Sequence, residues 1–131
     1  MTMENKYILI VDDNPGICRL LSEVLSNAGY STEIAINGEK AISIICTSIP
    51  LLIFLDIKMP GMNGIETLER IRQIIPSVPV VVMTAYSETH LVDESVRRGL
   101  VKHYINKPFD IYELLYLVEN IINDKIIYDI V

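Results

Sequence analysis

The chain has 131 residues, of which 50% are hydrophobic and 21% are charged. This size and composition are typical of one globular domain with a buried core. A net charge of −6 without any basic run argues against direct binding of nucleic acid. No charged leader before an apolar segment and no apolar run of membrane length is found, so we expect a soluble, cytoplasmic protein that does not bind membranes. Cys18 and Cys46 lie among apolar helical positions, and we expect both to pack in the core.

Apolar runs of strand length alternate along the chain with segments of helical periodicity. The expected strands are 7–11, 31–36, 51–55, 80–83 and 104–105. The segments between them, and a last one that begins after Asp110, carry apolar residues at intervals of three and four, which is typical of helices. The isoleucines of residues 123–131 fit either an extension of the last helix or the start of a linker. We therefore expect a domain at 1–122 and a C-terminal tail at 123–131.

The expected strands are mostly uninterrupted apolar runs rather than alternating ones. This pattern indicates a parallel sheet that is covered on both faces. Right-handed connections through the helices then predict a doubly wound α/β fold, a three-layer sandwich built from five β/α units. At the helix ends, we expect Gly29 to follow the first helix, Asn37 to open the second, and Ser87 and Asp110 to cap the fourth and fifth.

Polar residues follow the strands at the points where the strands end. Asp12 and Asp13 follow the first strand, Asp56 ends the third, Thr84 ends the fourth, and Lys107 comes shortly after the fifth. Because functional groups gather at the carboxyl ends of parallel strands, we expect these side chains to lie close together. Three neighbouring carboxylates repel one another unless a cation intervenes, and Mg²⁺ prefers such oxygen ligands. Beside Mg²⁺ and an ammonium group, Asp56 can stay ionised and accept a phosphoryl group.

Four segments, VDDNPG, LDIKMPGMNGIE, VVVMTAY and NKPFD, together resemble the receiver domain of two-component response regulators. The resemblance spans roughly residues 6–122 and implies the CheY-like, flavodoxin-like strand order 2-1-3-4-5. It implies that Asp56 is the phosphoacceptor. It also implies that Mg²⁺, or Mn²⁺ in its place, is bound by Asp12, Asp13, Asp56 and the main-chain carbonyl of Lys58.

The same resemblance implies roles for residues beyond the carboxylates. The hydroxyl of Thr84, the main-chain N–H of Ala85 and the ammonium of Lys107 would contact the phosphoryl group. Thr84 and Tyr104 would form the conformational switch, although Tyr104 fits an ordinary half-buried strand aromatic equally well. The peptide bond between Lys107 and Pro108 matches one that is cis in such domains.

The resemblance also implies partners. A histidine kinase or a histidine phosphotransfer protein would donate the phosphoryl group, and a downstream effector would bind the face formed by the fourth helix, fifth strand and fifth helix. The domain would be a monomer or a dimer that forms on activation. Two departures from the family pattern lie near this face: the segment between Gly99 and Tyr104 is one residue longer, and Leu100 replaces a small residue.

Two enzyme-like or cofactor-binding alternatives fit the sequence less well. A phosphatase of the haloacid dehalogenase type needs a second acid two residues after the nucleophile, where this chain has Lys58. A flavodoxin-like FMN module needs a phosphate loop rich in hydroxyl groups and glycine, whereas DDNPG would repel the phosphate. We therefore expect a phosphoacceptor signalling domain rather than an enzyme.

Overall fold

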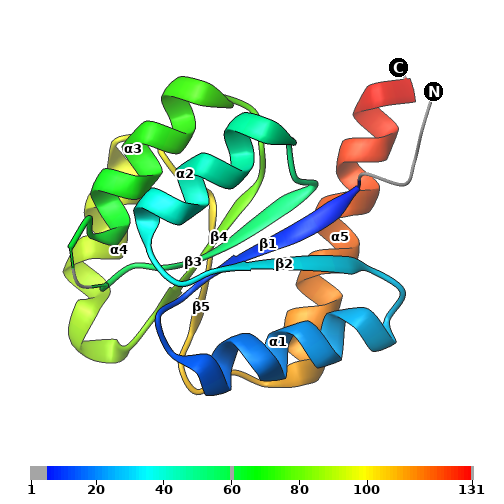
Figure 1. The fold of residues 1–131 in the computed structure, drawn as a ribbon, viewed down its shortest axis with the longest axis horizontal. Helices are drawn as coiled ribbons and strands as arrows, with labels where there is room; N and C mark the ends of the chain where they lie inside the picture. The colour runs from blue at the N-terminus through cyan, green and yellow to red at the C-terminus, as the bar shows by residue number, and fades with distance from the viewer. Residues whose placement is uncertain (1–5, 60, 131) are drawn as a thin grey trace.

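The structure is a computed structural model that describes residues 6–59 and 61–130. Strands and helices alternate along this part of the chain (Figure 1). The elements are β1 (Tyr7–Val11), α1 (Pro15–Asn27), β2 (Ser31–Ala35), α2 (Gly38–Thr47), β3 (Leu52–Asp56), α3 (Gly64–Ile74), β4 (Val80–Thr84), the 3₁₀ turn η1 (Tyr86–Glu88), α4 (Thr89–Arg97), β5 (His103–Asn106) and α5 (Ile111–Ile130).

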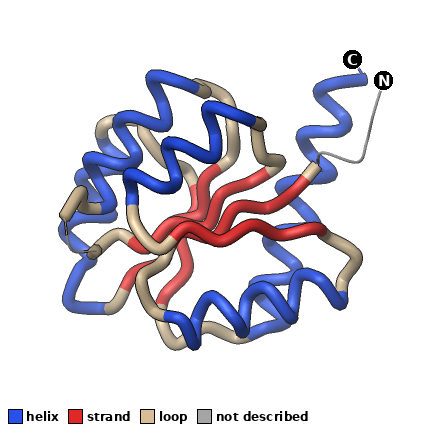
Figure 2. Tube along the Cα trace, in the orientation of Figure 1, coloured by secondary structure: helices blue, strands red, loops and turns tan. Residues whose placement is uncertain are grey.

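All neighbouring strands pair in parallel, in the order β2-β1-β3-β4-β5. The sheet forms the middle layer of the molecule, with helices on both faces (Figure 2). Helices α1 and α5 cover one face, and α2, α3 and α4 cover the other (Figure 1). The predicted doubly wound α/β/α sandwich and its strand order are confirmed.

The three inner strands β1, β3 and β4 are buried along their whole length. Because successive side chains of a strand point to opposite faces, each inner strand contributes to two cores. Leu9 and Leu55 pack toward α2, α3 and α4, whereas Ile10 and Phe54 pack toward α1 and α5. Each such fully buried side chain contributes roughly 1.5–3 kcal/mol of hydrophobic stabilisation. The two cores therefore fix the positions of the inner strands, and the ends of these strands carry the predicted site.

Asparagine side chains begin three of the helices. Asn14, Asn37 and Asn63 each accept a hydrogen bond from main-chain N–H groups in the first turn of α1, α2 and α3. The prediction that Ser87 caps the fourth helix is wrong. Ser87 lies inside η1, and α4 begins only at Thr89 because the chain first makes a 3₁₀ turn after β4.

The two cysteines differ in their surroundings. Cys18 is buried, and its thiol donates to the main-chain carbonyl of Asp12 at 3.2 Å. Cys46 is exposed, so the prediction that it packs in the core is wrong. Its neighbour Ile45 faces the core instead, which turns Cys46 to the solvent side of α2. Both thiols are free.

The segment between α4 and β5 is held by main-chain contacts and by one arginine. Gly99 adopts φ +71°, a conformation that glycine accepts readily, and the Leu100 N–H donates to the Ser95 carbonyl at 3.0 Å. The Arg72 guanidinium donates to the carbonyls of Leu100 at 2.7 Å and Val78 at 2.6 Å. These bonds fasten the C-terminal end of α4 to α3.

Two further expectations concern the C-terminal part of the chain. The peptide bond between Lys107 and Pro108 is cis, as the resemblance implied. Asp110 caps α5, because its carboxylate accepts from the N–H groups of Tyr112 at 2.7 Å and Glu113 at 3.3 Å. Helix α5 then continues past Ile122 to Ile130, so the segment that the sequence left unplaced is helical up to that residue.

Candidate functional site

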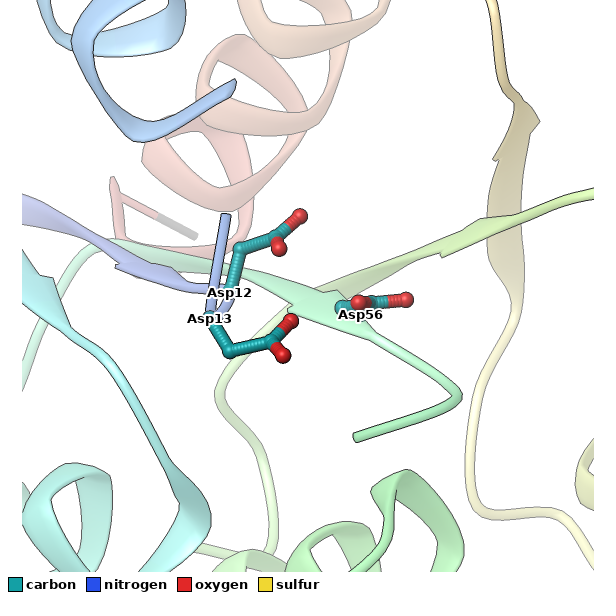
Figure 3. A group of neighbouring side chains, drawn as sticks. All are labelled: Asp12, Asp13 and Asp56. Atoms are coloured by element: carbon teal, nitrogen blue, oxygen red, sulfur yellow. The ribbon is translucent and has the colours of Figure 1, made fainter. Parts of the chain in front are cut away.

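Three carboxylates meet at the carboxyl edge of the sheet. Asp12 and Asp13 directly follow β1, and Asp56 is the last residue of the neighbouring strand β3. Asp12 is fully buried and Asp56 is 6% exposed, whereas Asp13 reaches solvent. One oxygen from each carboxylate lies within 4.8 Å of the other two. Figure 3 shows the three side chains pointing into a common space.

The local fold after β1 holds its two acids in place. The Asp12 N–H donates to the Ala35 carbonyl at 3.1 Å, which extends the pairing of β1 with β2 by one residue. The Asn14 N–H donates to the Asp12 carboxylate at 2.9 Å, while the Asn14 side chain caps α1. The chain therefore turns sharply between strand and helix, and the buried Asp12 carboxylate is hydrogen-bonded.

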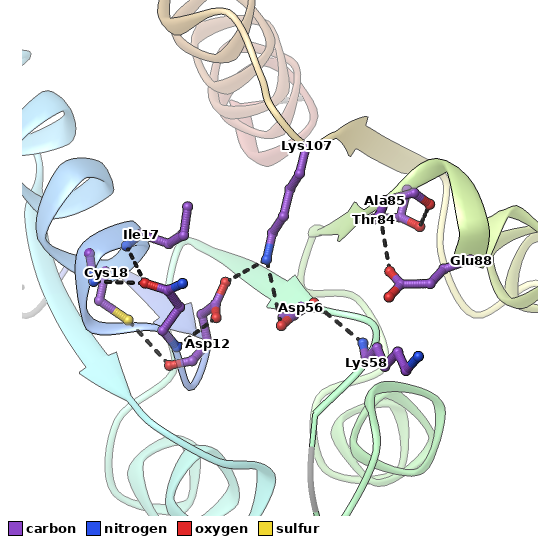
Figure 4. A network of polar contacts seen from close by, with 11 residues as sticks. Asp12, Ile17, Cys18, Asp56, Lys58, Thr84, Ala85, Glu88 and Lys107 are labelled. Carbon is purple, nitrogen blue, oxygen red and sulfur yellow. Dashed lines mark hydrogen bonds and ion pairs between the residues drawn. The ribbon is translucent and has the colours of Figure 1, made fainter.

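Lys107 reaches this group of carboxylates from the loop after β5 (Figure 4). Its ammonium lies 2.9 Å from Asp12 and 3.6 Å from Asp56. The main-chain N–H of Lys107 donates to the Thr84 carbonyl at 2.8 Å, so the loop continues the pairing of β5 with β4. One ammonium faces three carboxylates, and the site keeps an excess of negative charge.

This charge balance shifts two pKa values. Burial, followed by repulsion from the Asp12 carboxylate, raises the pKa of Asp56 from 3.8 to about 6, although Lys107 opposes the shift. Burial would lower the pKa of Lys107, but its bond to Asp12 and the proximity of Asp56 outweigh burial and raise that pKa. Lys107 is therefore a permanent cation, whereas the Asp56 carboxylate is poorly stabilised by the protein alone.

The loop after β3 folds back over Asp56 through a close main-chain approach. The Lys58 N–H donates to the Asp56 carboxylate at 3.3 Å, so the main chain of Lys58 lies beside the site. The Gly64 N–H donates to the Ile57 carbonyl at 3.0 Å. A Cβ on Gly64 would lie 2.3 Å from that carbonyl oxygen. Only glycine allows this contact, which explains the glycine of the MNG segment.

Thr84 ends β4 and Ala85 follows it, on the other side of Asp56. Since Asp56 pairs with Met83 in the register of β3 and β4, Thr84 lies one residue beyond this pair. The Thr84 hydroxyl donates to the Ala85 carbonyl at 3.0 Å. The Ala85 N–H donates to the Glu88 carboxylate at 3.0 Å. Both donors that sequence reasoning assigned to phosphoryl binding are thus engaged inside the turn formed by residues 84–88 (Figure 4).

Tyr104 lies apart from the carboxylates on the edge strand β5. It pairs with Val82 in the register of β4 and β5, and its side chain is 52% exposed. It borders a pocket together with Asn106, Pro108 and Glu113. The residue therefore lies half-exposed on the outer surface of the β5–α5 region, a position that fits both a half-buried strand aromatic and the switch position.

Sequence reasoning missed Glu88. A glutamate three residues after the residue that begins a turn is the spacing of a capping box, in which its side chain reaches back to the first main-chain N–H. The spacing Ala85-x-x-Glu88 carries this signal, whereas Ser87 belongs to a more common capping residue type. Ala85 has no side chain that can cap, so only the glutamate half of the box is present.

The donor set at this edge fits a hard divalent cation. Three carboxylates within 4.8 Å of one another repel unless positive charge lies between them, and Lys107 neutralises only part of this charge. Mg²⁺ takes oxygen ligands and binds through one or two carboxylates while it keeps several waters. The exposure of Asp13 leaves the site open to a hydrated ion.

A parallel sheet of this order with an acidic, lysine-paired site at its carboxyl edge defines the CheY-like class of α/β domains. The family model described as "Response regulator receiver domain" matches residues 8–119. The chain belongs to this family, a class of signalling domains in two-component systems.

Individual proteins support the same assignment. The chain is 46% identical to Sporulation initiation phosphotransferase F of Bacillus subtilis (strain 168), over 86% of this chain and 90% of that protein. It is 39% identical to Regulatory protein AtoC of Escherichia coli (strain K12), over 91% of this chain but 25% of that protein. The receiver domain of NtrX from Brucella abortus superposes with a TM-score of 0.83 and 31% identity, covering 88% of this chain and 98% of that one.

Within residues 6–59 and 61–130, no helix combines the length and the apolar character that crossing a bilayer requires.

Proposed function

We propose that this receiver domain accepts a phosphoryl group on Asp56 from a histidine kinase or a histidine phosphotransfer protein. The observation that carries the proposal is the position of Asp56. Its carboxylate lies at the tip of a buried strand, within 4.8 Å of the two acids Asp12 and Asp13 and 3.6 Å from the Lys107 ammonium. A carboxylate with a pKa of about 6 is ionised at neutral pH and is available as a nucleophile.

In the proposed reaction, a carboxylate oxygen of Asp56 forms a bond to phosphorus. The phosphorus–nitrogen bond of the donor's phosphohistidine breaks, and the donor imidazole leaves with the electron pair. Asp12, Asp13, Asp56 and the main-chain carbonyl of Lys58 would hold Mg²⁺, for which Mn²⁺ can substitute. A bound ion of this kind supplies neutralisation of charge on the phosphoryl oxygens. Lys107 contributes a second cation beside the same oxygens.

The proposed conformational response begins at the end of β4. The Thr84 hydroxyl and the Ala85 N–H leave their partners within the turn and donate to the phosphoryl oxygens. The turn before α4 then rearranges, and the equilibrium between two conformations shifts. The exposed Tyr104 is the proposed second part of the switch, on a face formed by α4, β5 and α5 that binds a downstream effector or a second copy of the chain.

Signalling fits this site better than catalytic turnover. The residue two positions after Asp56 is Lys58, so the second acid of a phosphatase of the haloacid dehalogenase type is missing. We therefore propose that phosphoryl acceptance and slow self-catalysed hydrolysis are the only reactions of the chain. Family membership supports a cytoplasmic location.

A relay role is supported by the match over 90% of Sporulation initiation phosphotransferase F. The chain spans only about a quarter of AtoC and NtrC, so an output domain like the remainder of those proteins stays an alternative. In either case we assign the receiver to residues 1–122 and treat residues 123–131 as a C-terminal extension.

The proposal is tested by incubation with acetyl phosphate and Mg²⁺. We expect a mass increase of one phosphoryl group that depends on Mg²⁺, is removed by hydroxylamine and is absent in Asp56→Asn. Asp93→Asn, which changes an exposed acid on α4, serves as the control and should label like the wild type. Labelling that survives Asp56→Asn would assign the phosphoryl group to another residue.

A further inference from the structure

The main chain of Ala85 is hydrogen-bonded at both ends within one turn. Its carbonyl accepts from the Glu88 N–H at 2.9 Å and from the Thr84 hydroxyl at 3.0 Å. Its N–H donates to the Glu88 carboxylate at 3.0 Å. Glu88 therefore contacts Ala85 through both its main chain and its side chain, and Figure 4 shows the side-chain contact. An anionic oxygen already occupies the donor that the proposed function assigns to the phosphoryl group.

We propose that Glu88 is an internal competitor of the phosphoryl group: its carboxylate holds the Ala85 N–H in the unphosphorylated protein and must be displaced when Asp56 is phosphorylated. This inference rests on the proposed function and adds to it the residue that opposes the switch. Glu88 touches neither substrate nor metal in this scheme and acts as a positioning residue. Its carboxylate is partly buried, so water does not fully replace the bond to Ala85.

Competition follows from the number of donors. A main-chain N–H offers one hydrogen, and a carboxylate oxygen at 3.0 Å uses it. A phosphoryl oxygen can bind there only after the Glu88 side chain leaves. The departing Glu88 carboxylate is negatively charged, like the phosphoryl group. It also repels the Asp56 carboxylate and so contributes to the raised pKa of Asp56. Displacement therefore moves one negative charge away as another arrives.

The structure also indicates where the movement is confined. Glu88 stands directly before α4, so its release frees the N-terminal end of this helix. The opposite end is fastened, because Arg98 pairs with both Glu69 and Glu94 and Arg72 binds the Leu100 carbonyl. Loss of the Glu88 contact is therefore expected to shift the first turn of α4 and leave its last turn in place.

The test compares Glu88→Ala, which removes acceptor and charge, with Glu88→Gln, which keeps an oxygen acceptor and removes the charge. Glu94→Gln is the control, because Glu94 lies within α4 and pairs with Arg98 rather than with Ala85. Binding of beryllofluoride, a phosphoryl analogue, is titrated at saturating Mg²⁺ by NMR of the Ala85 amide. Glu88→Ala removes one hydrogen bond to a charged group, which competes with the analogue. At the lower end of the usual strength of such a bond, beryllofluoride should bind Glu88→Ala about tenfold more tightly than it binds the wild type. Glu88→Gln should be intermediate, and the control should match the wild type.

Measuring the unfolding midpoint together with beryllofluoride affinity distinguishes a competitor role of Glu88 from a purely structural role. If Glu88 served only to cap the turn, Glu88→Ala would lower the midpoint of unfolding and leave beryllofluoride affinity unchanged or weaker, which would overturn the inference. An Ala85 amide resonance that is the same in free wild type and free Glu88→Ala would also overturn it. Wild-type protein that binds no beryllofluoride with Mg²⁺ would refute the proposed function itself, whereas wild-type binding with no gain in Glu88→Ala refutes only the role of Glu88.

Discussion

Replacing Asp56 by asparagine should stabilise the metal-free protein at neutral and alkaline pH. Burial and the nearby Asp12 carboxylate raise the pKa of Asp56 from 3.8 to about 6. At 1.36 kcal/mol per pKa unit, the charged carboxylate costs the folded state about 3 kcal/mol. Asparagine keeps the shape of the side chain without the charge, and Lys107 keeps its contact with Asp12. Because the amide fits the site less well than the carboxylate, we expect the free energy of unfolding to rise by about 1–3 kcal/mol.

The sign of the pH dependence follows from the direction of the shift. The folded protein binds this proton more tightly than the unfolded chain, so the cost of ionisation is fully present above pH about 6. The cost disappears as the pH falls below 3.8, where the carboxyl is protonated in both states. The difference between Asp56→Asn and wild type should therefore be largest near pH 8 and close to zero near pH 4.

Urea unfolding followed by far-ultraviolet circular dichroism measures this difference. With a slope of about 1–3 kcal/mol per molar urea for a small domain, the expected gain moves the midpoint upward by about 1 M in EDTA at pH 8. Asp93→Asn, at an exposed position, should stay within about 0.5 kcal/mol of wild type. If Asp56→Asn is less stable than wild type at pH 8, or if its gain does not shrink toward pH 4, the electrostatic reading of the site is wrong.

Mg²⁺ should stabilise the wild type against urea, by about 2.7 kcal/mol at a concentration 100 times its dissociation constant, because the proposed carboxylate site forms only in the folded protein. Asp13→Asn should lose most of this gain while its stability in EDTA changes little, and equal gains in both proteins would place the ion elsewhere. Gly64→Ala should destabilise by about 2–3 kcal/mol, since its Cβ would lie 2.3 Å from the Ile57 carbonyl oxygen. Gly16→Ala, whose Cβ would meet only the Asn14 side chain at 3.2 Å, is the matched control, and equal stabilities of the two variants would contradict the close approach.

The sequence was sufficient to predict the sheet and the edge on which the acids meet. Strands such as LLIFL are apolar throughout because both faces are covered, and this pattern alone indicates a parallel sheet. The rule that such strands end at one edge then brings Asp12, Asp56 and Lys107 together without any family knowledge. These inferences succeed because they depend on periodicity and topology, which a single sequence records directly.

What the sequence did not predict depends on the path of single turns. The pattern predicts that Ser87 caps α4, but the chain forms a 3₁₀ turn after β4. In this turn the Glu88 carboxylate accepts a hydrogen bond from the Ala85 N–H. Cys46 was expected in the core, although a rotation by one residue along α2 puts Ile45 there instead. Energies of a few tenths to about one kcal/mol decide such choices, and hydrophobic pattern does not resolve them.

The distances of Lys107 explain how one cation can attract Asp56, the proposed nucleophile, without blocking it. Its ammonium lies within hydrogen-bond distance of Asp12 at 2.9 Å but 3.6 Å from Asp56. The buried Asp12 is thus the fully neutralised partner, and it fixes the position of the ammonium. Asp56 receives attraction without a direct hydrogen bond from the lysine, so an oxygen lone pair stays free while its charge is only partly compensated. The same arrangement that makes the metal-free protein less stable therefore leaves Asp56 available for the proposed phosphoryl acceptance.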